Sequence, residues 1–126
     1  MTPLQEARQL APAFAMPRDY QRLVQCYGTA NFMEAVTRVR ANRPGATADV
    51  RNLVTELIRL QGAMQPMVLI ASDNRTERRF RADYTAVGDR LQRELGASRN
   101  PEAALQANLR TVQACQRDVV RWRGGS

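Results

Sequence analysis

The two cysteines, Cys26 and Cys115, are the residues whose type and spacing carry the most definite chemistry in this chain of 126 residues. Each falls on the apolar stripe of a predicted helical segment, one in the first segment and one in the last. At a rise of 1.5 Å per residue, both lie roughly 12 to 14 Å from the same end of an antiparallel bundle. Because the two side chains then face each other at one height, a disulfide between them is geometrically feasible. The alternative is that both thiols are small buried apolar groups in a cytosolic core.

A disulfide here would place the protein in an oxidising compartment, such as the periplasm or the cell exterior. It would close a loop of roughly 90 residues and stabilise the fold by about 4 to 5 kcal/mol in the chain-entropy treatment. Glu6 and Arg8 occupy the place of the apolar part of a signal peptide, so the sequence as written shows no export signal. We therefore expect a periplasmic or extracellular protein whose signal is no longer present. Free thiols would instead indicate the cytoplasm.

Histidine and lysine are both absent from the chain. Their absence removes imidazole acid–base catalysis, imidazole metal ligands, Schiff-base chemistry and the lysine of phosphate-binding loops. Two thiols supply at most half of a zinc site, so no metal site is predicted. Acidic residues such as Glu56 beside Arg59, or Glu94 beside Arg90, have the spacing of ion pairs on a helix surface. We expect a protein that is not an enzyme and that holds no cofactor.

The net charge of +7 comes entirely from arginine. A nucleic-acid module would continue such a charge with exposed aromatic residues or a recognition helix, and neither is visible in the sequence. We favour a solvated helix start for the densest group of arginines; the alternative is contact with phosphate groups or an acidic protein. This basic cluster lies between the second and third helical segments and consists of Arg75, Arg78, Arg79 and Arg81.

A second basic group is expected at the bundle end close to the cysteine pair. Trp122 ends the apolar stripe of the last segment and is either the last core residue, which we favour, or an exposed anchor for a partner protein. The group, which we call the second basic cap, combines arginines from the start of the first segment and the end of the chain: Arg18, Arg22, Arg117, Arg121 and Arg123.

Met64, Pro66 and Met67 form an adaptable apolar stretch in the second segment. Pro66 should kink the helix, because a helical proline clashes with the carbonyl four residues earlier, here that of Gly62. Core filling is the simpler interpretation of the two methionines. The alternative is a small apolar pocket opened by the kink, able to take an apolar ligand or a partner helix.

Apolar residues spaced three and four apart predict helices at about residues 17–41, 47–72, 76–95 and 101–123. Thr47 and Asn100 are expected N-caps, Pro101 opens the last helix, and Gly96 is expected to end the third. Four amphipathic segments with short connections predict an all-α, up-down-up-down antiparallel four-helix bundle. No apolar run approaches the length that a membrane span needs.

The expected organisation is a loosely ordered, flexible N-terminal arm at residues 1–16, one helical bundle domain at 17–123 and a flexible tail at 124–126. The favoured function is a non-catalytic, exported binding or structural module whose partner is another protein, for which an acidic surface would be suitable. Two alternatives remain open. One is a cytosolic protein that binds nucleic acid through the Arg75–Arg81 cluster, and the other is a carrier of a small apolar ligand near Pro66.

Overall fold

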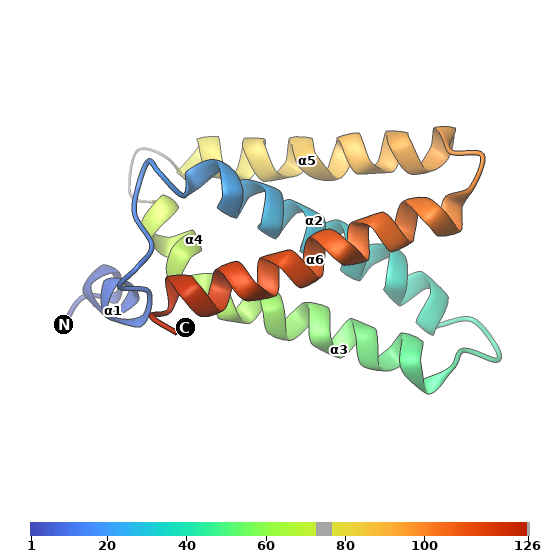
Figure 1. Ribbon diagram of the computed structural model, residues 1–126, viewed down its shortest axis with the longest axis horizontal. Helices are drawn as coiled ribbons and strands as arrows, with labels where there is room; N and C mark the ends of the chain where they lie inside the picture. Colours follow the sequence, from blue (N-terminus) through green and yellow to red (C-terminus); the bar gives the residue numbers. More distant parts are fainter. Residues whose placement is uncertain (73–76, 126) are drawn as a thin grey trace.

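The computed structural model describes residues 1–72 and 77–125, and within them it contains six α-helices and no strand. The all-helical prediction is therefore confirmed, although the helices outnumber the four expected segments. Figure 1 shows their arrangement. Their bounds are α1 Pro3–Leu10, α2 Tyr20–Ala41, α3 Ala48–Ala63, α4 Gln65–Ala71, α5 Glu77–Ala97 and α6 Pro101–Trp122.

Helix α2 is the central element of the fold. Helices α2 and α5 run from left to right in Figure 1, and α3 and α6 run back. The central helix packs against α3, α5 and α6. Because it is contacted from several directions, its buried residues do not follow one stripe: Cys26, Ala30 and Met33 lie on one face, and Val24, Gly28 and Phe32 lie on another. The apolar residues of the sequence therefore change face near Gly28 although α2 is one continuous helix.

Gly28 allows α5 to approach α2 closely. A Cβ atom at this position would lie 2.7 Å from the Cβ of Val87 and 2.8 Å from the carbonyl oxygen of Tyr84. Real Cβ atoms do not come so near to other heavy atoms, so any larger residue would force the two helices apart. Gly28 therefore has a packing role.

The N-terminal residues are more ordered than the predicted flexible arm. Thr2 and Gln5 form a capping box at the start of α1, in which each side chain bonds the backbone N–H of the other residue. Helix α1 packs against α4, and both Ala7 and Ala11 are buried. The following linker is tied to the end of α6, because the Ala13 N–H donates to the carbonyl of Trp122.

Several local signals have the structural role that the sequence predicts. The Thr47 side chain accepts a hydrogen bond from the Val50 N–H, and the Asn100 side chain accepts one from the Ala103 N–H. The second predicted segment breaks at Met64 into α3 and α4, with Pro66 in the first turn of α4. The prediction for Gly96 is wrong, because α5 continues to Ala97.

The tail expected to be flexible completes the end of α6. Gly124 has φ of 88°, a left-handed conformation that favours glycine. Its N–H donates to the Arg121 carbonyl, and the Gly125 N–H donates to the Val120 carbonyl. This is the Schellman pattern that satisfies free carbonyls at a helix end. Ser126 lies outside the described residues.

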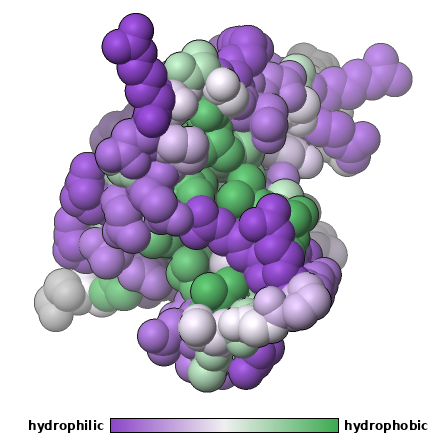
Figure 2. All heavy atoms as spheres, turned by 90° about the vertical axis from the view of Figure 1, so that its right-hand side faces the viewer, coloured by the Kyte–Doolittle hydropathy of each residue, from purple (hydrophilic) through white to green (hydrophobic). Residues whose placement is uncertain are grey.

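The end of the molecule at which α2 leads into α3 and α5 leads into α6 leaves part of the core open. Figure 2 shows apolar atoms in a strip between hydrophilic margins on this side. Half-buried apolar side chains near this end come from four helices and include Val36, Leu53, Leu95 and Leu109. The short helices α1 and α4 lie at the opposite end (Figure 1). Within the described residues, no helix combines the length and the apolar character needed to cross a membrane.

Candidate functional site

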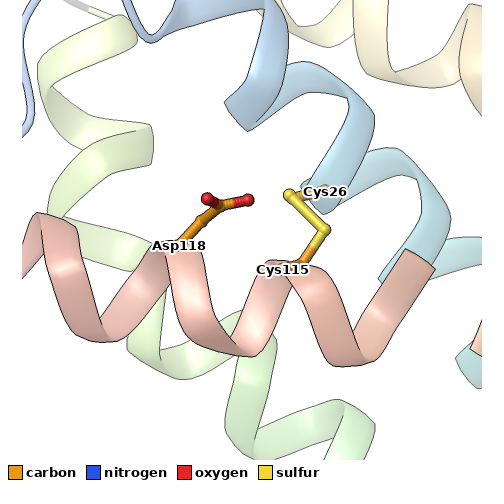
Figure 3. Close-up of side chains that lie close together, drawn as sticks. All are labelled: Cys26, Cys115 and Asp118. Atoms are coloured by element: carbon orange, nitrogen blue, oxygen red, sulfur yellow. A yellow bond between two sulfur atoms is a disulfide. The ribbon is translucent and has the colours of Figure 1, made fainter. Parts of the chain in front are cut away.

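The predicted cysteine pair is present as a disulfide between α2 and α6 (Figure 3). The Cα atoms of Cys26 and Cys115 are 5.5 Å apart, and the two residues are separated by 89 positions in the sequence. Both side chains are fully buried. The pairing follows from the antiparallel directions of the two helices, which bring an early position of α2 beside a late position of α6.

Asp118 lies next to this disulfide, one turn after Cys115 on α6 (Figure 3). One oxygen of its carboxylate and the two sulfur atoms all lie within 4.8 Å of one another. The carboxylate accepts hydrogen bonds from Arg22 at 2.6 Å and from Arg121 at 2.9 Å. Sulfur atoms bonded to each other are not thiolate ligands, and two arginines already neutralise the carboxylate. In the disulfide form, this cluster therefore joins α2 to α6 by one covalent bond, between Cys26 and Cys115, and by one ion pair, between Arg22 and Asp118.

The second basic cap is mostly engaged in holding the chain together. Arg22 joins α2 to α6 through Asp118, Arg121 bonds the same carboxylate, and Arg18 bonds both Asp19 and the Ala13 carbonyl. Arg123 donates to the carbonyl of Ala63 at 2.9 Å. Arg117 is exposed. The sequence predicted that these arginines lie at one end of the bundle. It did not predict their hydrogen-bond acceptors, some of which lie 60 or more positions away in the chain.

Trp122 is a core residue and not an exposed anchor, which corrects the alternative considered from the sequence. Its side chain is fully buried, with a relative exposure of 0%. Its ring meets that of Phe14 edge to face, with centroids 5.3 Å apart. The indole N–H makes no hydrogen bond, although it lies close enough to Asp19 to favour the charged form of that carboxylate and so to lower its pKa. Residues of the predicted arm thus complete the packing around Trp122.

Asp19 is a buried carboxylate that sequence reasoning missed. It accepts hydrogen bonds from the Ala15 N–H and from Arg18, each at 2.9 Å. Burial tends to raise the pKa of Asp19, but the bonds from Arg18 and from the Ala15 N–H outweigh this effect and hold the pKa below its ordinary value. Its position just before α2 was the available signal, since aspartate is frequent at helix starts.

The Arg75–Arg81 cluster is only partly accessible to a partner. Arg75 lies outside the described residues. Arg79 stacks over the ring of Tyr20 at 5.3 Å and forms an ion pair with Asp83 at 3.6 Å. Arg78 and Arg81 line an open groove of about 470 Å³ on α5, together with Asp89. The cluster is therefore interrupted by an acidic residue and by a structural contact.

The Tyr20 hydroxyl donates a hydrogen bond to Asp83 at 2.5 Å, which ties the start of α2 to α5. Burial and this neighbouring carboxylate raise the pKa of Tyr20 to about 12. The rings of Tyr20, Tyr27, Phe80 and Tyr84 pack on one another around this contact. Phe80, in the middle of this group, is buried.

Met64 and Met67 are fully buried and Pro66 is buried too, so the methionines fill the core and do not line a pocket. A groove of about 430 Å³ nevertheless lies beside Pro66, between α1 and the junction of α3 and α4. We call it the α1–α4 groove. The residues that matter for its chemistry are Glu6, Ala7, Leu10, Pro66, Leu69 and Arg123. The sequence offered a pocket at Pro66 as an alternative but assigned Met64 and Met67 to it, because α1, which forms one wall of the groove, was not predicted.

Comparisons with known proteins identify no relative. No protein-family model, no curated protein and no solved structure matches the chain.

Proposed function

We propose that the protein is an exported, non-catalytic binding module, built on an up-down-up-down core of α2, α3, α5 and α6. The observation that carries this proposal is the fully buried disulfide between Cys26 and Cys115. Structural disulfides form and persist in the periplasm and outside the cell, and they are rare in the cytosol. A covalent link between α2 and α6 also suits a fold whose helices leave one end partly open.

The acidic residues support a role without catalysis. Asp19 and Asp118 are the carboxylates described above in sheltered positions, and arginines bond both of them. A general base needs a pKa close to the working pH. The pKa of Asp19 is instead lowered, which makes this carboxylate a poor proton acceptor. With no histidine or lysine in the sequence, binding is the activity that the side chains support best.

The experiment is an intact-mass measurement on protein isolated from its native cells, unfolded with a denaturant and alkylated without a reductant. We expect both cysteines to react only after reduction, and we expect the protein in the periplasmic or extracellular fraction. Protein from the cytosolic fraction in which both cysteines react at once would contradict the proposal.

A carrier of an apolar ligand is the second candidate, and the α1–α4 groove beside Pro66 is the observation that favours it. Nucleic-acid binding through Arg78, Arg79 and Arg81 has weaker support, because Arg79 already contacts Tyr20 and Asp83. A nucleic-acid protein would bind DNA or RNA with an affinity that falls steeply as salt rises. The absence of binding at ~50 mM salt, which favours phosphate contacts, would remove that alternative.

A further inference from the structure

The α1–α4 groove has the size and the walls of a small-ligand site. Its volume of about 430 Å³ lies within the range of roughly 300 to 1,000 Å³ that is typical of such sites. Its two long walls come from helices that are far apart in the sequence. One wall is a single face of α1. The other wall is formed by residues of α3 and α4 on either side of the junction between these helices.

Two large apolar side chains remain unusually exposed in this groove. Leu10 on α1 is 51% exposed and Leu69 on α4 is 40% exposed, and both belong to the lining. Ala7 and Pro66 also line the groove and are buried. An apolar chain in the groove would remove both leucines from water, and this burial is favourable.

Arg123 gives the groove a positive end. One of its guanidinium N–H groups donates to the carbonyl of Ala63, the last residue of α3. This bond fixes the side chain and uses one of the five donors that an arginine carries. A planar guanidinium with free donors is well suited to a carboxylate or phosphate. Glu6 is exposed on the α1 wall. Its negative charge disfavours an anionic head group on that side of the groove and favours one at Arg123.

We propose that the α1–α4 groove binds one amphiphilic molecule with a medium-length apolar chain and an acidic head group. The chain lies between Leu10 and Leu69, and the head group is held by Arg123. This inference rests on the binding role proposed above and gives that role a ligand class.

The test is a titration of the disulfide-intact protein with decanoate and with decanol, both below their aggregation limits. The chain contains one tryptophan, and it precedes Arg123 directly, so its fluorescence reports on this end of the molecule. We expect saturable changes with both probes and an affinity about fivefold higher for decanoate, because an arginine–carboxylate contact at a partly exposed site is modest. The absence of saturation, or equal affinities, would overturn the proposal.

Matched variants locate the site. Leu69→Gln should weaken both probes by about tenfold, because it removes half of the apolar contact. Arg123→Gln should abolish the preference for decanoate and leave decanol unchanged. The control for Leu69→Gln is Val39→Gln, because the Val39 side chain is 58% exposed near the C-terminal end of α2, outside the groove. The control for Arg123→Gln is Arg110→Gln, because Arg110 is exposed on α6. If a control variant weakened binding as much as its matched partner, the groove would not be the site.

Two further measurements distinguish this proposal from binding to a lipid surface and from the proposed exported role. Phosphatidylglycerol vesicles test whether the groove takes a lipid surface instead of a single molecule. Sedimentation with the vesicles, in the absence of decanoate binding, would overturn the proposal. If decanoate binds but the cysteines of the native protein prove to be free, the groove stands and the exported role fails. If the disulfide is found but decanoate does not bind, only the groove fails.

Discussion

Asp19 links the protein's stability to pH at the scale of a single residue. An aspartate in an unfolded chain has a pKa of about 3.9, and the hydrogen bonds from Arg18 and Ala15 hold the folded-state pKa of Asp19 below its ordinary value. The unfolded chain therefore takes up this proton first as the pH falls. The stabilisation from Asp19 is fully present above the unfolded-state pKa and is lost as the pH falls through the folded-state pKa.

We therefore predict that Asp19→Asn lowers the free energy of unfolding by about 1 to 3 kcal/mol at pH 7. The difference between variant and wild type should shrink as the pH falls below about 4. Urea unfolding of both proteins at pH 7, 4 and 2.5 checks this. A difference that stayed constant over this range would show that the charge of Asp19 does not matter.

The position of Asp118 predicts slow reduction of the disulfide. Its carboxylate lies within 4.8 Å of both sulfur atoms. It offsets the positive charges of Arg22 and Arg121, which without it would favour the thiolates that reduction creates. Asp118→Asn should therefore speed reduction by glutathione a few-fold, as followed by timed alkylation and mass measurement.

Arg22→Gln distinguishes this charge effect from simple loosening of the fold. Arg22 forms the ion pair with Asp118 that joins α2 and α6. If charge controls the rate, removal of this cation should slow reduction, since Arg121 is then the only arginine that still bonds the carboxylate. Faster reduction in both variants would mean that the ion pair slows reduction only by holding α2 and α6 together and keeping the reductant away from the disulfide.

At the scale of elements, the contact between α2 and α5 depends on Gly28. Alanine has a higher helix propensity than glycine by up to about 1 kcal/mol, yet a Cβ here would lie 2.7 Å from that of Val87. Overpacking of this kind costs about 1 to 3 kcal/mol. We expect Gly28→Ala to lower the melting temperature.

Gly88→Ala is the matched control for Gly28→Ala, because a Cβ on Gly88 in α5 would meet no atom within 4 Å. We expect this substitution to stabilise the protein by about 0.5 to 1 kcal/mol. Thermal unfolding of the two variants beside the wild type gives both signs in one experiment. An increase in stability for both variants would contradict the close packing of α2 on α5.

The helix starts could be predicted from the sequence because their signals are local. Thr47 and Asn100 bond N–H groups three positions away, so the relevant information lies within one turn. The capping box of α1 and the glycine cap after α6 are equally local, but both were missed, because residues 1–16 were expected to form a flexible arm and residues 124–126 a flexible tail. The close approach at Gly28 could not be predicted, since it depends on how α5 crosses α2.

The candidate site also has parts that could be predicted from the sequence and parts that could not. The pairing of Cys26 with Cys115 could be predicted from rise per residue and helix direction, because each cysteine lies on an apolar stripe. The partners of the arginines could not, since an exposed cation can reach several acceptors with little difference in free energy. The α1–α4 groove depends on where α1 lies against α4, which no spacing in the sequence encodes.

At the scale of the whole molecule, the disulfide restricts the unfolded chain. The two cysteines are 89 positions apart, and the chain-entropy treatment gives about 4 to 5 kcal/mol for a loop of this size. The double variant Cys26→Ser with Cys115→Ser should therefore melt at a clearly lower temperature than the oxidised wild type. The wild type in a strong reductant is the control, and it should melt close to the variant. Equal melting temperatures for all three would remove the stabilising role of the disulfide.

The same disulfide determines what a protease can release from the molecule. Most of the chain lies between Cys26 and Cys115, so a single cut in any connection from α2 to α6 leaves two fragments joined through sulfur. The cleaved protein would keep its mass apart from one added water, and it would separate into two bands on a gel only after reduction. Its helices could remain packed around α2 after the backbone is broken, so proteolytic damage within this loop need not release any part of the molecule.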